Sequence, residues 1–168
     1  MASIVVLGAG IGGMSVAYEL RALLGKDHPV TVVGEGEQFS FTPSNPWVAV
    51  GWRARREIEV ALPPVMAKKG IGFTGVGAKR VHPTGNRIEL NDGSSVDYDY
   101  LVIATGASTN FFGNKNLEQH AFPMKSTVEA LQLRHKLIQN FEDALHSNSA
   151  DELEKLMNIV VVLPMAND

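Results

Sequence analysis

Residues 3–13 read SIVVLGAGIGG, a short apolar and β-branched run followed directly by a cluster of glycines. The run Ser3–Leu7 predicts a buried strand. After the glycines, apolar residues recur three and four positions apart, which predicts a helix from about Gly12 to Leu24. The apolar run Val30–Val33 predicts a second buried strand. The chain therefore opens with a βαβ unit, and parallel strands joined by a helix indicate an α/β sheet.

The glycine cluster matches the pattern G-x-G-x-x-G between a predicted strand and a predicted helix, the context in which this pattern indicates a dinucleotide-binding turn. The first glycine permits a tight turn, a side chain at Gly10 would block a pyrophosphate, and Gly13 lets helix and strand approach closely. The N–H groups and the partial positive charge at the start of the helix would face the phosphates. A glycine-rich turn without a ligand is the alternative. The predicted cofactor-binding residues of this turn are Gly8, Ala9, Gly10, Ile11, Gly12 and Gly13.

An acidic residue about 20 positions beyond the fingerprint is expected to contact the ribose hydroxyls. The second predicted strand ends with Val33, Gly34 and Glu35, which makes Glu35 the candidate ribose contact and adds Gly34 to the predicted site. An acid is more usual one position earlier, where this chain has Gly34, and a solvated loop charge is the alternative for Glu35. NAD-binding and FAD-binding domains share this opening, so these residues do not choose between the two cofactors.

The middle of the chain predicts a loop, a short helix and an antiparallel meander. Residues 39–52 carry four aromatic residues among prolines and polar residues, which predicts an ordered loop with buried aromatic anchors. Pro63 and Pro64 suit the first turn of a short helix that runs to Lys69. Residues 71–102 predict strands, with a hairpin turn at Asn91-Asp92-Gly93.

The second half of the chain predicts a strand, a long helix and a final strand. Tyr100–Ala104 is apolar and reads as a strand, and Ser126 with Glu129 predicts a capping box on a helix that runs to about His146. The expected fold class is α/β, a Rossmann-like FAD-binding domain with a central parallel sheet and a small antiparallel β-meander, over residues 1–157. The apolar run Asn158–Leu163 predicts a further strand, and we expect residues 158–168 to be the first strand of a second dinucleotide-binding-like domain that is cut off here.

Composition narrows the class of protein. The 168 residues are 45% apolar and 20% charged, which describes one compact domain. No uncharged run is long and apolar enough for a membrane span, and the absence of cysteine excludes disulfides, thiolate catalysis and thiolate metal sites within these 168 residues. A locally basic stretch at residues 53–87 lacks interleaved aromatics and the net charge is −3, so we expect no nucleic-acid partner. The five histidines are scattered, so no metal site is expected.

Residues 97–107 read DYDYLVIATGA and follow the predicted meander. A meander that returns through an apolar strand ending in Ala-Thr-Gly resembles the FAD domain of flavoproteins built from two dinucleotide-binding folds. The resemblance implies FAD, rather than NAD, as the ligand. It also implies that Thr105 and Gly106 approach the cofactor through their backbone and that Ala78 lies by the adenine. An ordinary turn after a strand is the alternative.

Two further segments, residues 41–48 (FTPSNPWV) and 50–52 (VGW), look like the loop of sulfide:quinone oxidoreductases that carries Ser44 and Asn45 beside the flavin. Type II NADH:quinone dehydrogenases usually carry a different loop there, although residues 109–113 and 118–126 are as similar to those enzymes as to the sulfide enzymes. Residues 163–166 (LPMA) lack the second glycine fingerprint expected of an NADH-using relative, which favours a donor such as sulfide.

The resemblance implies an FAD-dependent oxidoreductase that passes electrons from sulfide to a quinone, with the protein supplying binding and orientation. The alternatives are a type II NADH:quinone dehydrogenase and a non-catalytic nucleotide-binding module. Many sulfide enzymes have a cysteine where this chain has Ser126, which is interpreted here as a helix cap. No catalytic residue is assigned, and we expect these 168 residues to be inactive alone because the family holds the flavin ring from both sides.

For the full-length enzyme the resemblance implies sulfide and quinone as partners and a location on the cytoplasmic side of the membrane. We expect membrane contact only through chain beyond Asp168, and homo-oligomers are possible in the family.

Overall fold

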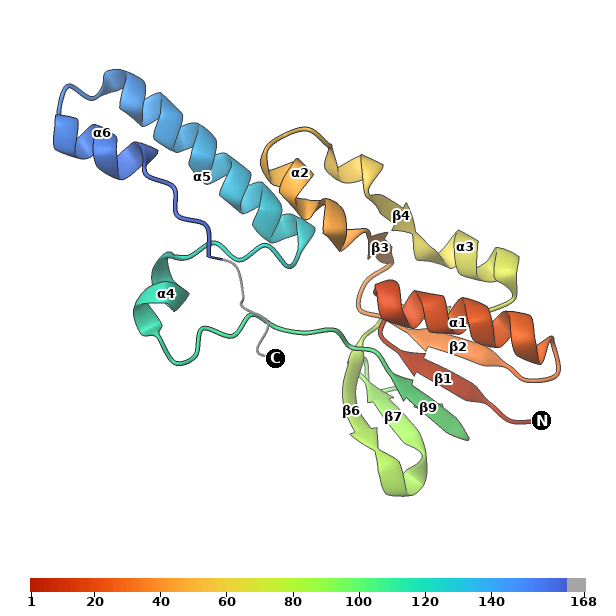
Figure 1. Ribbon diagram of the computed structural model, residues 1–168. Coiled ribbons are helices and arrows are strands. Elements are labelled where there is room, and N and C mark those ends of the chain that lie inside the picture. The colour runs from red at the N-terminus through yellow and green to blue at the C-terminus, as the bar shows by residue number, and fades with distance from the viewer. Residues whose placement is uncertain (163–168) are drawn as a thin grey trace, which may run out of the picture.

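The computed structural model describes residues 1–162. Its centre is a four-stranded parallel sheet with the strand order β5-β2-β1-β9 (Figure 1). Ile4 pairs with Val30 on one side and with Tyr100 on the other, so the three apolar runs that were expected to share a sheet do so. The elements of this unit are β1 (Ile4–Leu7), α1 (Ile11–Leu24), β2 (Val30–Val33), β5 (Gly72–Thr74) and β9 (Tyr100–Ile103).

Alternate residues of β1 enter two different cores. Ile4 and Val6 pack with α1 and with α3 (Leu62–Lys69), the helix predicted from Pro63 and Pro64, which ends at left-handed Gly70. Val5 and Leu7 pack on the opposite face against residues of the meander, among them Ile88 and Leu90. Because successive side chains of a strand point to opposite faces, the fully apolar β1 reflects burial on both sides. The α/β prediction is therefore confirmed, with α1 over one face of the sheet (Figure 1).

The meander forms a separate three-stranded antiparallel sheet, as predicted. The turn between its last two strands contains Gly93, at a φ of 85°, within the predicted Asn91-Asp92-Gly93 hairpin. The first strand has a register shift between Ala78 and Arg80, which leaves Lys79 as an extra residue. The strands are β6 (Ala78–His82), β7 (Arg87–Leu90) and β8 (Ser95–Asp97), and the short helix η3 (Pro83–Gly85) joins the first two.

The segment at residues 38–61 differs from its prediction. Instead of an ordered loop with buried aromatic anchors, residues 39–52 hold a short helix. Phe39 packs against the core beneath α1, but Trp52 is 77% exposed and Trp47 is 39% exposed. The buried residues of this helix are Asn45, Val48 and Ala49, because the helix turns Val48 and Ala49 toward α5 and leaves Trp47 on its outer side. The elements are β3 (Gln38–Ser40), which pairs antiparallel with β4 (Glu59–Ala61), and between them η1 (Thr42–Ser44), α2 (Asn45–Ala49) and η2 (Arg55–Glu57).

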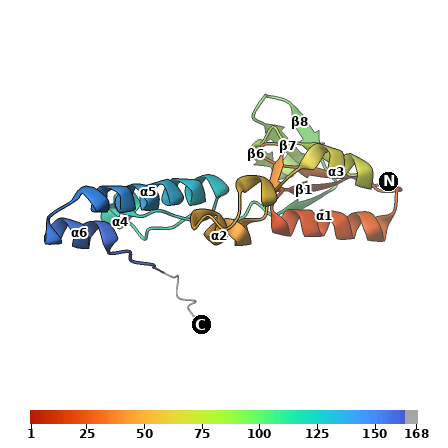
Figure 2. The ribbon, with the colours of Figure 1, turned by 90° about the horizontal axis from the view of Figure 1, so that it is seen from above.

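Three helices form an arm that extends away from the sheet (Figure 2). Val48 and Ala49 of α2 pack with Ala130 of α5, which joins the arm to the rest of the molecule. α5 begins with the predicted capping box: Ser126 Oγ accepts the N–H of Glu129, and the Glu129 carboxylate accepts the N–H of Ser126. The helices of the arm are α4 (Lys115–His120), α5 (Thr127–His146) and α6 (Ala150–Met157).

Residues 158–162 form no strand with any described part of the chain, and Val160 is 78% exposed. A strand needs a hydrogen-bonding neighbour, and the one backbone hydrogen bond that these residues make within the described chain runs from the N–H of Asn158 to the carbonyl of Glu154 in the preceding helix. Residues 163–166, which carry the rest of the predicted strand and the missing second fingerprint, lie outside the described residues. The assignment of residues 158–168 to a second domain therefore stays a prediction. Among the helices described here, none has the length and apolarity to cross a membrane.

Candidate cofactor-binding groove

A groove of about 1110 Å³ runs along the edge of the sheet where β1, β2 and β9 end. Ligands of open α/β sheets bind at this carboxyl edge of the strands. Ten of the thirteen predicted site residues line the groove, and Gly13, Ser44 and Asn45 do not. The ten are Gly8, Ala9, Gly10, Ile11, Gly12, Gly34, Glu35, Ala78, Thr105 and Gly106.

Two glycines of the fingerprint are required by the fold itself. Gly8 has a φ of +115°, and a Cβ there would strike the carbonyl group of Ala104. A Cβ at Gly13 would strike the carbonyl oxygen of Gly8, and Gly13 lies outside the lining of the groove. The N–H of Gly8 donates to the carbonyl of Val33 at 2.8 Å, which ties the turn to β2, and the N–H of Ala104 donates to the carbonyl of Leu7 at 2.7 Å, which ties the end of β1 to β9.

Gly10 and Gly12 are different, because a Cβ at either position would meet nothing within 4 Å. Gly10 has a φ of −79°, a conformation open to any residue. The absence of side chains here keeps the groove open above the N-terminus of α1. That end of α1 has no side-chain cap and no acidic residue in its first turn, so its N–H groups and partial positive charge are available to an anion. The turn therefore fits a pyrophosphate.

Glu35 lies at one end of the groove, where β2 approaches the meander. Its backbone bridges to Val76, and the N–H of Gly77 donates to the carbonyl of Gly34 at 2.9 Å. A Cβ at Gly34 would come within 2.8 Å of the Ala9 Cβ, so this position needs glycine for close approach to the fingerprint turn. The Glu35 carboxylate has no hydrogen bond or ion pair within residues 1–162. It is free to accept hydrogen bonds from ribose hydroxyls.

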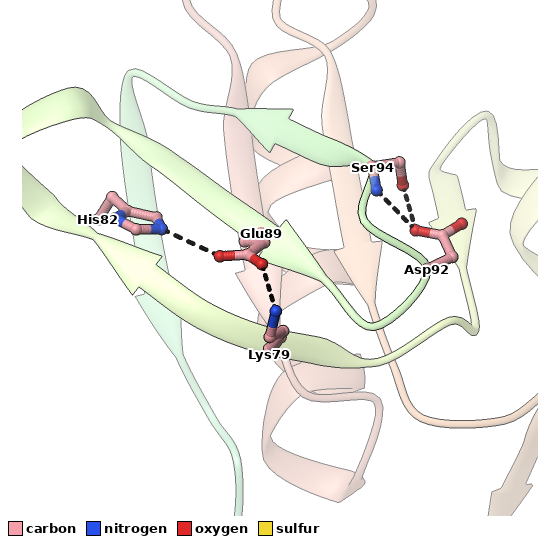
Figure 3. Close-up of polar contacts among 5 residues, drawn as sticks. All are labelled: Lys79, His82, Glu89, Asp92 and Ser94. Atoms are coloured by element: carbon pink, nitrogen blue, oxygen red, sulfur yellow. Dashed lines mark hydrogen bonds and ion pairs between the residues drawn. The ribbon is translucent and has the colours of Figure 1, made fainter.

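The same end of the groove contains Lys79 and Arg80, two residues that were not predicted from the sequence. The extra residue in β6 brings Ala78 and the next three residues to the groove, and no sequence pattern marks such a bulge. Lys79 Nζ lies 2.7 Å from Glu89 Oε1, and Glu89 Oε2 lies 3.4 Å from His82 Nε2 (Figure 3). The hydrogen bond from Lys79, assisted by His82, holds the pKa of Glu89 below its ordinary value. This carboxylate thus positions Lys79 beside the groove.

The other end of the groove follows β9. Thr105 and Gly106, the latter at a φ of +76°, form one wall. The facing wall comes from two distant segments, one from the end of β3 onward and one before α5, and no sequence pattern assigned its residues to the site. These residues are Ser40, Thr42, Pro43, Met124 and Lys125.

Ser44 and Asn45 lie behind that second wall and are completely buried. Arg53 Nη1 donates to Ser44 Oγ at 2.6 Å, and its guanidinium lies 4.7 Å from the centre of the Trp47 ring. Asn45 Nδ2 donates to the carbonyl of Met124 at 3.3 Å. Both residues therefore support the groove wall, and neither forms its surface.

The groove offers binding groups, and within residues 1–162 none of its hydroxyl groups is hydrogen-bonded to a histidine or a carboxylate. Within the described residues, no three His, Cys, Asp or Glu side chains are placed to share a metal ion. The arrangement can hold an anionic, two-part ligand of dinucleotide size: an open glycine turn in the middle, a free carboxylate at one end and a lysine at the other.

Comparison with known proteins gives a consistent result. Residues 2–162 match the model of the pyridine nucleotide-disulphide oxidoreductase family. The chain is 37% identical over 134 residues to a sulfide-quinone reductase of Aquifex aeolicus, covering 80% of this chain and 31% of that protein. It is 33% identical to the external alternative NAD(P)H-ubiquinone oxidoreductase B4 of Arabidopsis thaliana, covering 95% of this chain and 29% of that protein.

The solved structures that match include a sulfide:quinone oxidoreductase and an NDH2. The crystal structure of the Aquifex aeolicus sulfide:quinone oxidoreductase superimposes with a TM-score of 0.79 at 34% identity, over 85% of this chain and 33% of that one. NDH2 of Plasmodium falciparum in complex with NADH superimposes with a TM-score of 0.76 at 25% identity, over 92% of this chain and 32% of that one. The chain spans about a third of the length of these relatives.

Proposed function

We propose an FAD-binding function for this chain, which belongs to the pyridine nucleotide-disulphide oxidoreductase family. The observation that carries the proposal is the shape of the groove at the start of α1. Gly10 and Gly12 leave it open where the N–H groups of the helix point outward, and it continues in both directions from that place. A dinucleotide has a pyrophosphate at its centre and a bulky group at each end, which matches this geometry.

Each part of the groove has a role in this proposal. The backbone of Gly10, Ile11 and Gly12 binds the pyrophosphate, and Glu35 accepts hydrogen bonds from the ribose on the adenosine side. Ala78 lies by the adenine, and the backbone of Thr105 and Gly106 contacts the flavin side. Bound FAD would supply the two-electron chemistry, while these residues bind and orient it.

The parent reaction that we propose is electron transfer from sulfide to a quinone. It is supported by the likeness to the sulfide-quinone reductase and by the resemblance of residues 41–48 to the loop of sulfide:quinone oxidoreductases. An NAD(P)H:quinone reaction is the second candidate, because the NAD(P)H-ubiquinone oxidoreductase of Arabidopsis matches over 95% of the chain. Sulfide and quinone would then be the substrates, with contact to the cytoplasmic face of a membrane made outside these residues.

Titration calorimetry of the purified chain with FAD, NAD⁺ and NADH tests the choice of cofactor. The proposal requires FAD to bind and the two nicotinamide nucleotides to bind much more weakly or not at all. Tight NADH binding to a protein that takes up no FAD would refute it. A chain that binds FAD while no donor reduces the flavin in any context would fit the non-catalytic alternative.

The donor is tested by two chimaeras in which this chain replaces the matching third of a relative, one of the Aquifex sulfide enzyme and one of the Plasmodium NDH2. We expect sulfide to reduce the flavin of the first chimaera faster than NADH reduces that of the second, in anaerobic stopped-flow experiments. Rapid reduction in the NDH2 chimaera alone would favour the NAD(P)H:quinone reaction.

A further inference from the structure

Lys125 occupies the end of the groove opposite to Glu35. It shares that end with Thr42, Pro43 and the residues that follow Gly106, whereas Glu35 shares the other end with the meander. The glycine turn lies between these two ends. A dinucleotide whose pyrophosphate lies at the turn and whose adenosine lies beside Glu35 therefore presents its second half to Lys125.

Hydrogen bonds fix both the backbone and the ammonium group of Lys125. Its N–H donates to Glu129 Oε2 at 2.8 Å, and its Nζ donates to the carbonyl of Ser108 at 3.1 Å. The side chain of Lys125 thus reaches from the start of α5 to the segment after β9. An ammonium has three donors, and the Ser108 carbonyl accepts only one of them.

No carboxylate balances this ammonium within residues 1–162. The Glu129 carboxylate is the acid nearest in sequence, and it accepts the backbone N–H groups of Lys125 and Ser126 as part of the capping box. By contrast, Lys79 at the adenosine end is paired with Glu89 at 2.7 Å. The flavin end of the groove therefore contains a positioned cation with donors to spare.

A buried polar cluster keeps the backbone at Lys125 in place. Thr127 is 4% exposed, and its hydroxyl lies 2.5 Å from Ser40 Oγ and 3.5 Å from Asn45 Oδ1. Asn45 in turn donates to the carbonyl of Met124. These bonds join β3, α2 and the start of α5, so both segments of the groove wall are fixed with Lys125 at their edge.

We propose that Lys125 is a specificity-determining residue that recognises the flavin half of FAD, an inference that rests on the proposed FAD-binding function. The pyrimidine part of the flavin ring presents carbonyl oxygens and ring nitrogens, which accept hydrogen bonds and donate few. A positioned ammonium complements that edge, and a hydrogen bond to a charged donor is stronger than a neutral one. Ligands that contain only the adenosine half do not reach it.

The test compares FAD with ADP, which has the adenine, ribose and pyrophosphate but no ring. In Lys125→Met we expect the Kd of FAD to rise about tenfold, since losing a charge-assisted hydrogen bond is worth about 1.4 kcal/mol or more. The Kd of ADP stays within about twofold. Lys125→Arg restores most of the FAD affinity. Lys136→Met, an exposed lysine of α5 outside the groove, leaves both affinities unchanged.

Two outcomes overturn the inference. An equal loss of FAD and ADP affinity places Lys125 at the pyrophosphate, and an unchanged FAD affinity in both Lys125→Met and Lys125→Gln removes its role. Far-ultraviolet circular dichroism confirms that the variants are folded, as expected for an exposed side chain. A wild-type chain that binds ADP but not FAD would instead contradict the proposed function, and the role of Lys125 with it.

Discussion

The carbonyl oxygen of Gly8 occupies the place that a Cβ atom of residue 13 would need. The contact joins the first and last glycines of the fingerprint and sets how closely α1 approaches the end of β1. The neighbouring Gly12 has no such contact and faces open space. Glycine is therefore needed at position 13 for the packing of α1 on β1, and at position 12 to keep the groove open.

Gly13→Ala should destabilise the protein by about 1–3 kcal/mol, because the added methyl group must displace backbone that is tied to β2. Gly12→Ala should keep the free energy of unfolding or raise it by up to about 1 kcal/mol, since alanine favours a helix. Urea unfolding at equilibrium measures both. Equal effects of the two substitutions would contradict the packing role of Gly13.

Ser126→Ala should remove the side-chain cap of α5 at a cost of about 1 kcal/mol. The loss should appear in hydrogen exchange of the Glu129 amide, which donates to Ser126 Oγ. Ser149→Ala, at the cap of α6, is the matched control and should change exchange at Glu152 alone. Unchanged protection at Glu129 would contradict the capping role of Ser126.

Thr127→Val should destabilise the protein by about 1–3 kcal/mol, because valine fills the same volume and leaves a half-buried and a buried polar partner without their hydrogen bonds. Those partners are the Ser40 hydroxyl and the Asn45 side chain. Thr84→Val, at an exposed turn of the meander, is the control and should be close to neutral. Comparable stability of the two variants in urea would contradict the structural importance of the buried cluster.

Asp99 gives a prediction for acid stability. Its carboxylate accepts the N–H of Ser3 at 2.6 Å and the Ser3 hydroxyl at 3.1 Å, and these bonds hold its pKa below the ordinary value. A lowered pKa stabilises the folded state above the unfolded-state pKa, and that stability is lost as the pH falls through the folded-state pKa. Below about pH 4 the wild type should therefore lose stability more steeply than Asp99→Asn.

Urea unfolding at several pH values measures these slopes. Asp97→Asn is the control, because the Asp97 carboxylate accepts no hydrogen bond from the described residues. Parallel pH profiles for Asp99→Asn and the wild type would contradict a role for Asp99 in anchoring the start of β1.

The elements that local patterns specify were predictable. Apolar runs identified β1, β2 and β9, and the capping box at Ser126 marked the start of α5 to the residue. The central part of the groove could be predicted from β1 and the glycines after it, since a glycine fingerprint between a strand and a helix has a defined geometry. The cap of α6 had a similar signal, a serine at 149 with an acid three residues later, but that helix was not predicted.

Features that depend on distant segments were not predictable. The exposure of Trp47 and Trp52 and the burial of Ser44 and Asn45 follow from the packing of α5 on α2, across some eighty residues of sequence. The flavin-side wall has the same origin, because Lys125 and Thr42 meet only after the chain folds. No spacing in the sequence indicates that approach.

The most direct measurement is the affinity of FAD for Gly10→Val. A valine at this position meets no protein atom within 4 Å of its Cβ, so the fold should be kept while the side chain fills the place of the pyrophosphate. Gly85→Val is the matched control, since its Cβ also faces open space but it lies at the meander turn outside the groove. We predict that Gly10→Val has the Tm of the wild type and a Kd for FAD that is higher by a factor of about 100 or more, a loss of roughly 3 kcal/mol in binding free energy. Gly85→Val should bind FAD with the affinity of the wild type. Undiminished FAD binding by a folded Gly10→Val would contradict the assignment of this groove as the cofactor site.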